Sequence, residues 1–346
     1  MSRGPAPHIR VAIAGLGVAG ESHLFDAITH PALTVVGVCA RRPERARQIA
    51  AAFGVTAVYD ALDELLRAQR PDAVIVATPP RYLTAHASRA LHAGAQVLLE
   101  KPGAATPVDV ERLAQASMDH GPGRCIVGYP RRYRTGWDRV RALLSAGRVG
   151  DVRHVRLAWR GPYRSRFSPD ADSYRATPAV RVGGVVLDTG SHMVDLCHFL
   201  LGTTIEVAFA DLVLAEDGAD IGASWNARLA GGATVEASIA DSGDAEHGEV
   251  TLEGTRGRMW IRESGDRVEI AVAGEEFDER GYVARPVDDL VALHRGQPTR
   301  GATIEQAVRA AAAVQSIYRA ARMKLERAPR WISPRAKCWG RLSGAC

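Results

Sequence analysis

The feature that most constrains the fold is a glycine-rich segment near the start of the chain, Gly15-Leu16-Gly17-Val18-Ala19-Gly20. It closes the apolar run 9–15 and opens a helical pattern over about 17–29. In such a turn the first glycine permits the tight bend, the second lets a pyrophosphate approach the backbone, and the third lets the helix pack on the strand. The helix N-terminus then offers free N–H groups to phosphates. This context predicts a dinucleotide site rather than a tight turn without a ligand.

Strands and helices then alternate as far as residue 127. The predicted strands cover 33–39, 57–59, 73–77 and 96–100, and the predicted helices cover 43–53, 62–68 and 84–93. Strands that are apolar throughout are typical of a parallel sheet covered by helices on both faces. Residues 8–127 are therefore expected to form a Rossmann domain, a doubly wound parallel sheet.

The pattern changes in the second half of the chain. After a predicted helix over 137–146, several segments alternate apolar and polar residues, which is typical of antiparallel strands. These predicted strands cover 152–160, 205–214, 224–229, 234–240, 250–253, 258–262 and 268–272. Residues 128–326 are thus expected to form a substrate domain around an open, mainly antiparallel sheet.

Two helices and a tail complete the prediction for this half. One helix, 191–201, interrupts the strands. An Ala-rich helix, 304–325, follows them and could pack against the first domain. The tail 327–346 has no periodicity and is expected to be disordered.

Composition excludes several classes of protein. The net charge of +5 arises from 44 basic and 39 acidic residues scattered along the 346 positions, so neither a nucleic acid nor a membrane surface is expected as partner. No apolar run approaches the ~20 residues of a membrane-spanning helix, and no secretory signal is recognisable. The five cysteines form no CxxC pair, which argues against a disulfide framework and a zinc ribbon. We expect a cytoplasmic protein.

The second strand predicts which dinucleotide is bound. An acidic residue about 20 positions after the glycine motif would bind a ribose 2′-hydroxyl, but Ala40 stands there, followed by Arg41 and Arg42. Two arginines after a small residue suit a 2′-phosphate, so NADP is favoured and NAD remains the alternative. The arginines could instead be solvated loop charges, with Arg41 stacking on the adenine.

Lys101 is the first candidate for chemistry. Only three of the 44 basic residues are lysines, and Lys101 is the only one before residue 324. It lies in Glu100-Lys101-Pro102, directly after the strand 96–100, and ligands of open α/β sheets bind beyond the carboxyl ends of the strands. Lys101 is therefore expected where the nicotinamide and substrate meet, although a surface lysine is the alternative.

Asp188 and His192 are the second candidate pair. If the helix already includes Asp188, these side chains share a face, and the carboxylate can fix the tautomer of an acid–base imidazole. The alternatives are a helix-capping Asp188, a core His192, or a metal site with Asp195 and His198. His198 follows His192 by six residues and so points elsewhere, and no metal is expected.

Further residues are expected to border the substrate site. The segment 129–134 interleaves bases and aromatics, and we expect Tyr129 and Arg132 to line the site, together with Arg175 of the segment 172–175. Trp159 and Tyr163 are equally compatible with a core position.

These features together resemble the Gfo/Idh/MocA family of nicotinamide-dependent oxidoreductases over about residues 8–325. The matching motifs are Gly15-x-Gly17-x-x-Gly20, Ala77-Thr78-Pro79-Pro80, Ala90-Leu91-x-Ala93-Gly94, Glu100-Lys101-Pro102, Val127-Gly128-Tyr129 with Arg132-Tyr133, and Gly183-Gly184 with Asp188-x-x-x-His192. Departures are Ala40, Leu83, where many members have histidine, and Pro130, where Asn or His is frequent.

The resemblance implies a set of functional residues and partners. Lys101, Asp188 and His192 would be catalytic and would also bind substrate, and the substrates would be sugars, nucleotide-linked sugars, cyclitols or trans-dihydrodiols. The cofactor would lie on Gly15, Gly17, Val18, Ala19, Gly20, Arg41, Arg42, Thr78, Pro79, Glu100 and Lys101. Homodimers or homotetramers would form, commonly through the open sheet.

The expected reaction is hydride transfer between nicotinamide C4 and a secondary alcohol carbon or its ketone. His192 would move the hydroxyl proton, Lys101 would polarise the same oxygen, and Asp188 would orient the site. With NADP, reduction of a ketone is the expected direction. A redox-neutral glycosidase with bound NAD and a dinucleotide-sensing regulator are the rival functions, and an imine could replace the ketone.

Overall fold

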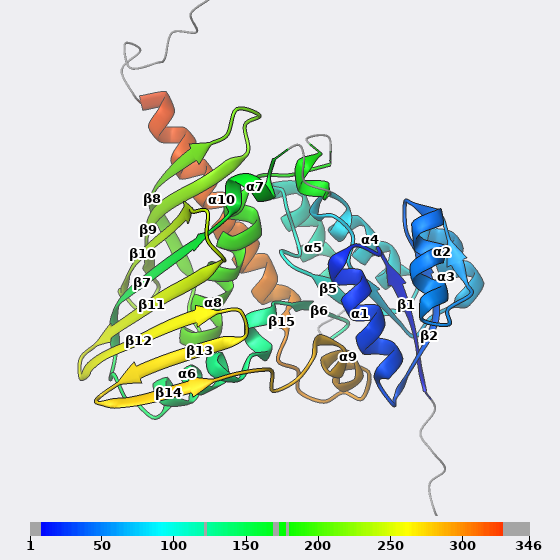
Figure 1. Cartoon of the computed structure of the whole chain (residues 1–346), viewed down its shortest axis with the longest axis horizontal. Coiled ribbons are helices and arrows are strands. Elements are labelled where there is room, and N and C mark those ends of the chain that lie inside the picture. The colour runs from blue at the N-terminus through cyan, green and yellow to red at the C-terminus, as the bar shows by residue number, and fades with distance from the viewer. Residues whose placement is uncertain (1–7, 121–122, 169–172, 178–179, 328–346) are drawn as a thin grey trace, which may run out of the picture.

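Two sheets lie side by side in the computed structural model, which describes residues 8–120, 123–168, 173–177 and 180–327 (Figure 1). Of the predicted tail 327–346, residues 328–346 lie outside the described residues, and Arg327 ends the last helix. The first sheet has seven strands in the order β15-β6-β5-β4-β1-β2-β3. These are β1 (Ile9–Ala14), β2 (Leu33–Cys39), β3 (Val58–Tyr59), β4 (Ala73–Val76), β5 (Gln96–Glu100), β6 (Cys125–Gly128) and β15 (Ala302–Thr303). All neighbouring strands pair in parallel except β15, so the Rossmann prediction is confirmed.

Helices cover both faces of this first sheet because its strands are apolar on both sides. The helices are α1 (Val18–Thr29), α2 (Pro43–Ala52), α3 (Leu62–Gln69), α4 (Pro80–His92) and α5 (Pro107–His120). Along β1, Val11 and Ile13 pack with α1 and α2, whereas Ala12 and Ala14 pack with α3, α4 and α5. The alternation within one strand therefore builds two separate cores, one on each face.

The second sheet has eight strands in the order β14-β13-β12-β11-β7-β10-β9-β8. They are β7 (Val152–Gly161), β8 (Ile205–Leu214), β9 (Asp220–Leu229), β10 (Thr234–Asp241), β11 (His247–Gly254), β12 (Gly257–Ser264), β13 (Arg267–Val272) and β14 (Glu275–Glu279). The sheet is antiparallel apart from the pairing of β7 with β10, which confirms a mainly antiparallel second sheet.

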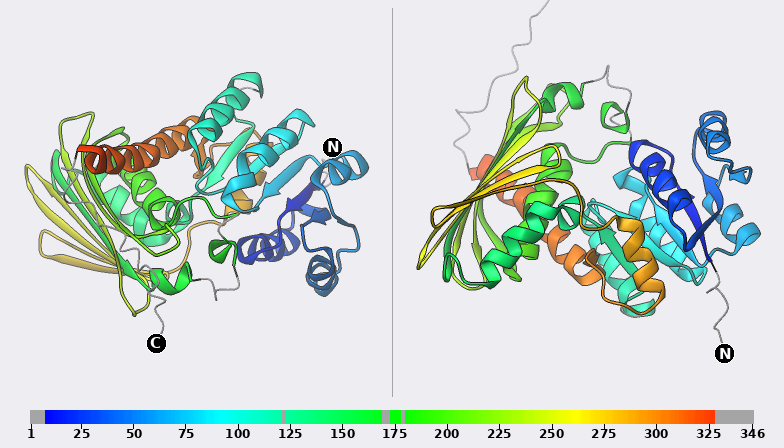
Figure 2. Two further views of the ribbon diagram at one scale, coloured as in Figure 1. Left: turned by 90° about the horizontal axis from the view of Figure 1, so that it is seen from above. Right: turned by 60° about the horizontal axis from the view of Figure 1, so that its bottom comes forward.

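One face of this sheet is covered by α6 (Thr135–Ser145), α8 (Ser191–Leu201) and α10 (Ile304–Arg327) (Figure 2). Alternate residues of the strands point toward these helices, as Val235, Ala237 and Ile239 of β10 do. On other strand positions large side chains remain exposed, among them Phe209 and Trp260. The sheet is thus open on one side, as the alternating pattern predicts.

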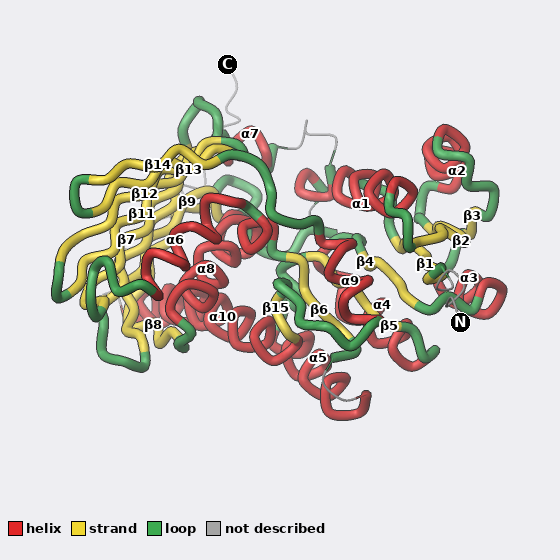
Figure 3. Tube along the Cα trace, turned by 90° about the horizontal axis from the view of Figure 1, so that it is seen from below, coloured by secondary structure: helices red, strands yellow, loops and turns green. Residues whose placement is uncertain are grey.

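The C-terminal segment returns to the first sheet. Helix α9 (Pro286–His294) packs in the same core as α1, and β15 pairs with β6. Helix α10 crosses between the two sheets (Figure 3). Its first turns, at Ile304 and Ala307, belong to the core of the first sheet, and Val314 and Ile317 belong to that of the second. None of the helices in the described ranges is long and apolar enough to span a membrane.

Candidate active site

The glycine-rich turn joins β1 to α1 with a different role for each glycine. Gly15 has φ +96°, and a Cβ there would lie 2.5 Å from the Ala77 carbonyl oxygen. A Cβ on Gly20 would lie 1.9 Å from the Gly15 carbonyl oxygen. Gly17 differs, because nothing lies within 4 Å of the position of its Cβ. Gly15 and Gly20 are therefore required by the close backbone packing of the turn, whereas Gly17 leaves space at the start of the helix.

This space fits the pyrophosphate of a dinucleotide. Helix α1 begins after Gly17 without a side-chain cap, so its first backbone N–H groups have no internal acceptor. Val18 in its first turn is 89% exposed, so its side chain does not fill the space beside Gly17. Together with the open Gly17, these features form a backbone cradle for a dinucleotide.

We expect Gly17→Ala and Gly20→Ala to separate binding from folding. Gly17 has φ −84° and open surroundings, so its alanine variant should unfold at the wild-type temperature but bind NADPH at least about tenfold more weakly. Gly20→Ala forces a methyl group into backbone and should lose about 1–3 kcal/mol of stability. Thermal unfolding and fluorescence titration of NADPH measure the two effects. Unchanged NADPH affinity in the Gly17 variant would contradict this assignment.

The other predicted cofactor residues lie along the same edge of the first sheet. Arg41 and Arg42 follow β2 and are exposed. Ala40, which lies between this strand and the two arginines, is partly buried. Thr78 and Pro79 follow β4 after one residue, Ala77, and Pro79 is the residue before α4. All of them therefore lie at the carboxyl ends of the strands, where ligands of such sheets bind.

Glu100 ends β5 and connects this strand to α1. Its Oε1 is 2.8 Å from Nε2 of His23, a buried residue of α1, and its Oε2 accepts a hydrogen bond from the Lys101 backbone N–H. These contacts fix the backbone from which the Lys101 side chain projects.

Lys101 and Asp188 meet although 87 residues separate them. The Lys101 Nζ donates to Oδ1 of Asp188 at 2.7 Å and to the Asp188 carbonyl oxygen at 3.1 Å. One residue comes from the first domain and the other from the turn before α8. The structure thus brings together two of the three predicted catalytic residues.

Two arginines share the same carboxylate. Arg175 donates from Nε to Oδ2 and from Nη2 to Oδ1 of Asp188, at 3.1 and 2.8 Å, and Arg166 Nη1 lies 3.4 Å from Oδ2. Burial alone would raise the pKa of Asp188, but Lys101 and Arg175 hold this pKa well below its usual value. Asp188 is therefore ionised at neutral pH.

A π-helical turn, Val186–Gly190, carries Asp188 into this position. The buried Asp220 anchors the turn: it accepts the Val186 N–H at 2.7 Å and the Tyr318 hydroxyl at 3.1 Å. Gly184 lies so close that a Cβ would be 2.0 Å from the Asp220 carbonyl oxygen. Gly184 thus permits close packing against the start of β9.

His192 lies in the first turn of α8, beside Tyr129, with ring centroids 6.1 Å apart. Its Nδ1 is buried, and no partner for it is present among the described residues. Burial and the nearby charge of Lys101 hold the pKa of His192 well below its usual value, so the ring is neutral at pH 7.

The expectation that Asp188 contacts and orients His192 needs correction. The hydrogen bonds that the described residues make to the Asp188 carboxylate come from Lys101, Arg166 and Arg175. Three cations are stronger donors to a carboxylate than a neutral imidazole, and the π-helical turn alters the spacing of an α-helix. Asp188 instead positions the Lys101 ammonium.

Two predicted substrate residues lie in the interior. Tyr129 is fully buried and donates its hydroxyl to the Pro102 carbonyl oxygen at 3.2 Å. Arg132 is buried in a bidentate ion pair with Asp195. Neither side chain reaches a surface on which a substrate could lie, so both act through packing. Arg175 does line the site, and Trp159 and Tyr163 are core residues.

A narrow cavity lies between the two domains at this point. It is lined from the first domain by Pro80, Lys101 and Pro102, and from the second by Phe167, Tyr174, Arg175, Arg181, Val182, Gly184, Leu187 and Asp188. The described residues contain no cluster of His, Cys, Asp and Glu arranged to hold a metal ion.

The sequence alone did not identify Arg166 or the anchoring pair Asp220 and Tyr318, because no local sequence pattern distinguishes these residues.

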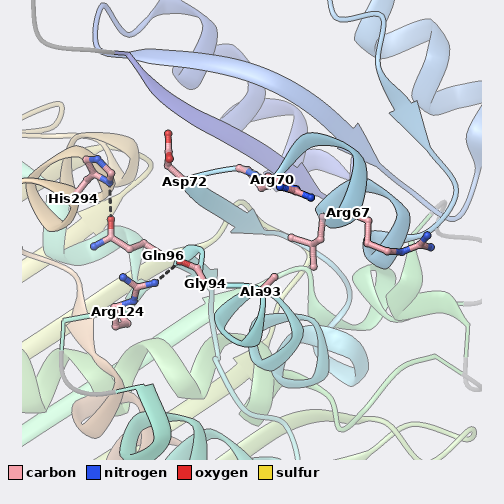
Figure 4. Close-up of a pocket in the computed structure, with 10 residues that line it drawn as sticks. Arg67, Arg70, Asp72, Ala93, Gly94, Gln96, Arg124 and His294 are labelled. Atoms are coloured by element: carbon pink, nitrogen blue, oxygen red, sulfur yellow. Dashed lines mark hydrogen bonds between the residues drawn. The ribbon is translucent and has the colours of Figure 1, made fainter.

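A second cavity, of about 740 Å³, lies at the opposite edge of the first sheet (Figure 4). Its lining includes Asp72, Gln96 and Arg124, which precede or begin β4, β5 and β6. In this cavity His294 contacts Gln96, and Arg124 donates to the Gly94 carbonyl. It is therefore separate from the carboxyl edge that carries Lys101.

Comparison with known proteins identifies the family. Residues 9–129 match the model of an oxidoreductase family with an NAD-binding Rossmann fold, GFO_IDH_MocA, and residues 137–260 match the GFO/IDH/MocA C-terminal domain. A dTDP-3,4-didehydro-2,6-dideoxy-alpha-D-glucose 3-reductase of Streptomyces violaceoruber is 33% identical over 224 residues, 62% of this chain and 61% of that protein. A D-glucoside 3-dehydrogenase of Escherichia coli K12 is 30% identical over 197 residues, 56% of this chain and 54% of that protein. The matches thus span somewhat over half the length of these relatives.

A solved structure supports the same assignment over most of the chain. GenD2 from gentamicin A biosynthesis, determined in complex with NAD, superposes with a TM-score of 0.76 at 25% identity and covers 93% of this chain and 97% of its own. The order of the two domains agrees with the two family models, which match residues 9–129 and 137–260. The chain therefore belongs to the Gfo/Idh/MocA family of oxidoreductases, with an NAD-binding Rossmann domain followed by the family's C-terminal domain.

Proposed function

We propose that this protein transfers a hydride between NADP(H) and a secondary alcohol carbon, or its ketone, in a sugar, nucleotide-linked sugar or cyclitol. The observation that carries the proposal is the pairing of Lys101 with Asp188 beside His192, at the carboxyl edge where the glycine-rich turn would place a dinucleotide. The bound cofactor would supply or accept the hydride at nicotinamide C4. Because cells keep NADP mostly reduced, the favoured direction is reduction of the ketone.

The chain's own residues handle the proton and the oxygen. The Lys101 ammonium, held by Asp188, donates a hydrogen bond to the substrate oxygen and polarises its bond to carbon. In the oxidation direction the neutral His192 accepts the hydroxyl proton, and in the reduction direction it returns this proton to the oxygen. Its lowered pKa keeps the ring unprotonated and able to accept at pH 7, although as a weaker base. In the reduction direction the ring must first take up a proton from solvent, and its protonated form, a stronger acid than free imidazolium, then gives this proton to the oxygen.

The relatives support the class of substrate. The names of the Streptomyces reductase and the Escherichia coli dehydrogenase both describe a reaction at position 3 of a sugar. An inositol 2-dehydrogenase of Rhizobium meliloti is 26% identical over 293 residues, 82% of each chain.

We further propose a homodimer or homotetramer assembled through the open face of the eight-stranded sheet, where Phe209 and Trp260 are exposed.

A screen of keto-sugars and cyclitol ketones for NADPH oxidation tests the proposal. Purified protein should oxidise NADPH in the presence of at least one of these ketones and reduce NADP⁺ with the corresponding alcohol. Protein that retains bound cofactor through purification but reduces no added ketone would instead support the redox-neutral reaction.

We expect the cofactor preference to depend on Arg41 and Arg42. Both side chains are exposed after β2, and their guanidinium groups suit a 2′-phosphate. The wild type should bind NADPH at least about tenfold more tightly than NADH, and the double variant R41A/R42A should lose most of this difference because charge-assisted hydrogen bonds contribute about 1.5–3 kcal/mol. Fluorescence titration with both cofactors measures it, and a clear preference of the wild type for NADH would refute the assignment.

A further inference from the structure

The cavity at the amino edge of the first sheet has the size of a ligand site. Its volume of about 740 Å³ lies within the range of small-molecule sites, about 300–1,000 Å³. Figure 4 shows Arg70 and Asp72, from the segment between α3 and β4, above Gln96 and Arg124. None of the residues predicted for the dinucleotide or the substrate lines this cavity. The proposed reaction therefore makes no use of it.

The backbone around the cavity is fixed by the sheet. Asp72, Gln96 and Arg124 stand where β4, β5 and β6 begin. The Asp72 N–H donates to the Arg10 carbonyl oxygen, and the Gln96 N–H donates to that of Asp72, both at 2.9 Å. The Val97 N–H donates to the Arg124 carbonyl oxygen at the same distance. Little ordering of the backbone is thus needed when a ligand binds.

Arg70 has a backbone conformation that its residue type disfavours. With φ +45° and ψ +59° it is left-handed at the C-cap of α3, where glycine is the usual residue. Its backbone N–H donates to the Leu66 carbonyl oxygen, and glycine would make this capping bond without steric cost. Within the described ranges, the other non-glycine residue with positive φ, Ala273, lies in the turn between β13 and β14. Capping therefore does not account for the Arg70 side chain, which lines the cavity.

Arg70 and Arg124 have hydrogen-bond donors that the protein does not use. Arg124 donates from Nη2 to the Gly94 carbonyl oxygen. Among the residues that the structure describes, no carboxylate pairs with either guanidinium group. Because a guanidinium group has five N–H donors, both side chains can bind a further acceptor.

The charge of this cavity does not depend on residues outside the described ranges. The acidic residues among them are Asp170 and Asp172 alone. These two lie in the sequence between Arg166 and Arg175, which bind Asp188 at the opposite edge of the sheet. The segments 1–7 and 121–122, which adjoin the amino edge in sequence, contain no Asp or Glu.

We infer that this cavity binds a phosphate monoester that also carries hydroxyl groups, either a sugar phosphate or a nucleoside monophosphate. Arg70 and Arg124 bind the phosphate, because its three terminal oxygens can accept from two guanidinium groups at once. Asp72 accepts from a hydroxyl group: its Oδ2 takes the Arg10 N–H at 2.8 Å, and no partner for its Oδ1 is present among the described residues. Since the cavity is separate from Lys101, the inference is independent of the proposed reaction.

Calorimetric titration of the full chain, with its dinucleotide site saturated by NADPH, tests the inference with two pairs of ligands. Ribose 5-phosphate should bind at least about tenfold more tightly than D-ribose, and AMP at least about tenfold more tightly than adenosine, as expected for charge-assisted hydrogen bonds. Tighter binding of AMP than of ribose 5-phosphate identifies a nucleoside monophosphate, and equal or weaker binding of AMP identifies a sugar phosphate. If neither phosphate binds better than its neutral counterpart, the inference is overturned.

Variants of the two arginines locate the site. Arg70→Gly suits the left-handed backbone and should unfold at or above the wild-type temperature, and Arg124→Gln keeps an amide that can donate to Gly94. Each should lower the affinity for the preferred phosphate about tenfold or more without changing the affinity for NADPH. Arg89→Ala is the control, because Arg89 pairs with Asp63 and does not line the cavity. Phosphate affinity at the wild-type level in both variants would place the ligand elsewhere and overturn the inference.

Discussion

Lys101→Ala is expected to lower turnover about 100- to 10,000-fold while the affinity for NADPH remains nearly unchanged. The variant removes the ammonium that would polarise the substrate oxygen, but it leaves the glycine-rich turn intact. The carboxylate of Asp188 keeps its bidentate contact with Arg175 and its contact with Arg166, so no buried charge is left without a partner. The loss should therefore appear in the chemical step and not in the stability of the fold.

The measurement combines turnover, NADPH titration and thermal unfolding of the same preparation. Arg89→Ala is a suitable control, because Arg89 lies in the same domain on α4, is 55% exposed and pairs with Asp63 at the surface. The control should leave all three quantities unchanged. Turnover of the Lys101 variant at the wild-type level would remove this residue from the catalytic set.

Local patterns were sufficient for most elements of the first domain. The glycine motif and the apolar strands have short-range signatures, and the predicted strands agree closely with β1 to β5. Helix α4 begins at Pro80, four residues before the predicted start at 84, because a proline suits the first turn of a helix. Helices α5 and α9 were not predicted at all.

Contacts between distant parts of the chain were not predictable in the same way. The parallel pairing of β7 with β10 joins strands more than 70 residues apart, and β15 adds a C-terminal segment to the N-terminal sheet. Register and strand order in such pairs depend on tertiary packing rather than on the pattern of a single segment. The sequence therefore predicted the type of the second sheet but not its order.

For the site as well, features that are local in sequence could be predicted, whereas burial and contacts between distant residues could not. Lys101 was predicted from its position after a strand, and its contact with Asp188 follows from the meeting of two domains. The alternation of bases and aromatics over 129–134 was misleading, because the same residue types occur in a buried ion-pair network and in a binding site. Arg132 and Tyr129 belong to the interior, whereas Arg175 lines the cavity. Only burial distinguishes these roles, and burial is set by the tertiary fold.

The second large effect is expected from the interior position of Arg132. Its guanidinium binds Asp195 through Nε and Nη2, at 3.0 and 2.7 Å, and donates from Nη1 to Gln306 at 2.8 Å. The pair therefore connects the segment Pro130–Tyr133, helix α8 and the start of helix α10. Asp195→Asn would leave the Arg132 charge buried without a counter-ion and should lower the free energy of unfolding by about 3–5 kcal/mol.

An exposed pair of the same geometry provides the control. Arg267 binds Asp278 through Nε and Nη2 at 2.8 and 2.9 Å, but the Asp278 side chain is 48% exposed, against 2% for Asp195. Because water solvates the exposed charges, Asp278→Asn should leave the midpoint of urea unfolding almost unchanged. Equal shifts of the midpoint in the two variants would show that burial does not govern the strength of the Arg132 pair. A loss confined to Asp195→Asn would show that burial gives the Arg132 pair its structural role in joining these three segments.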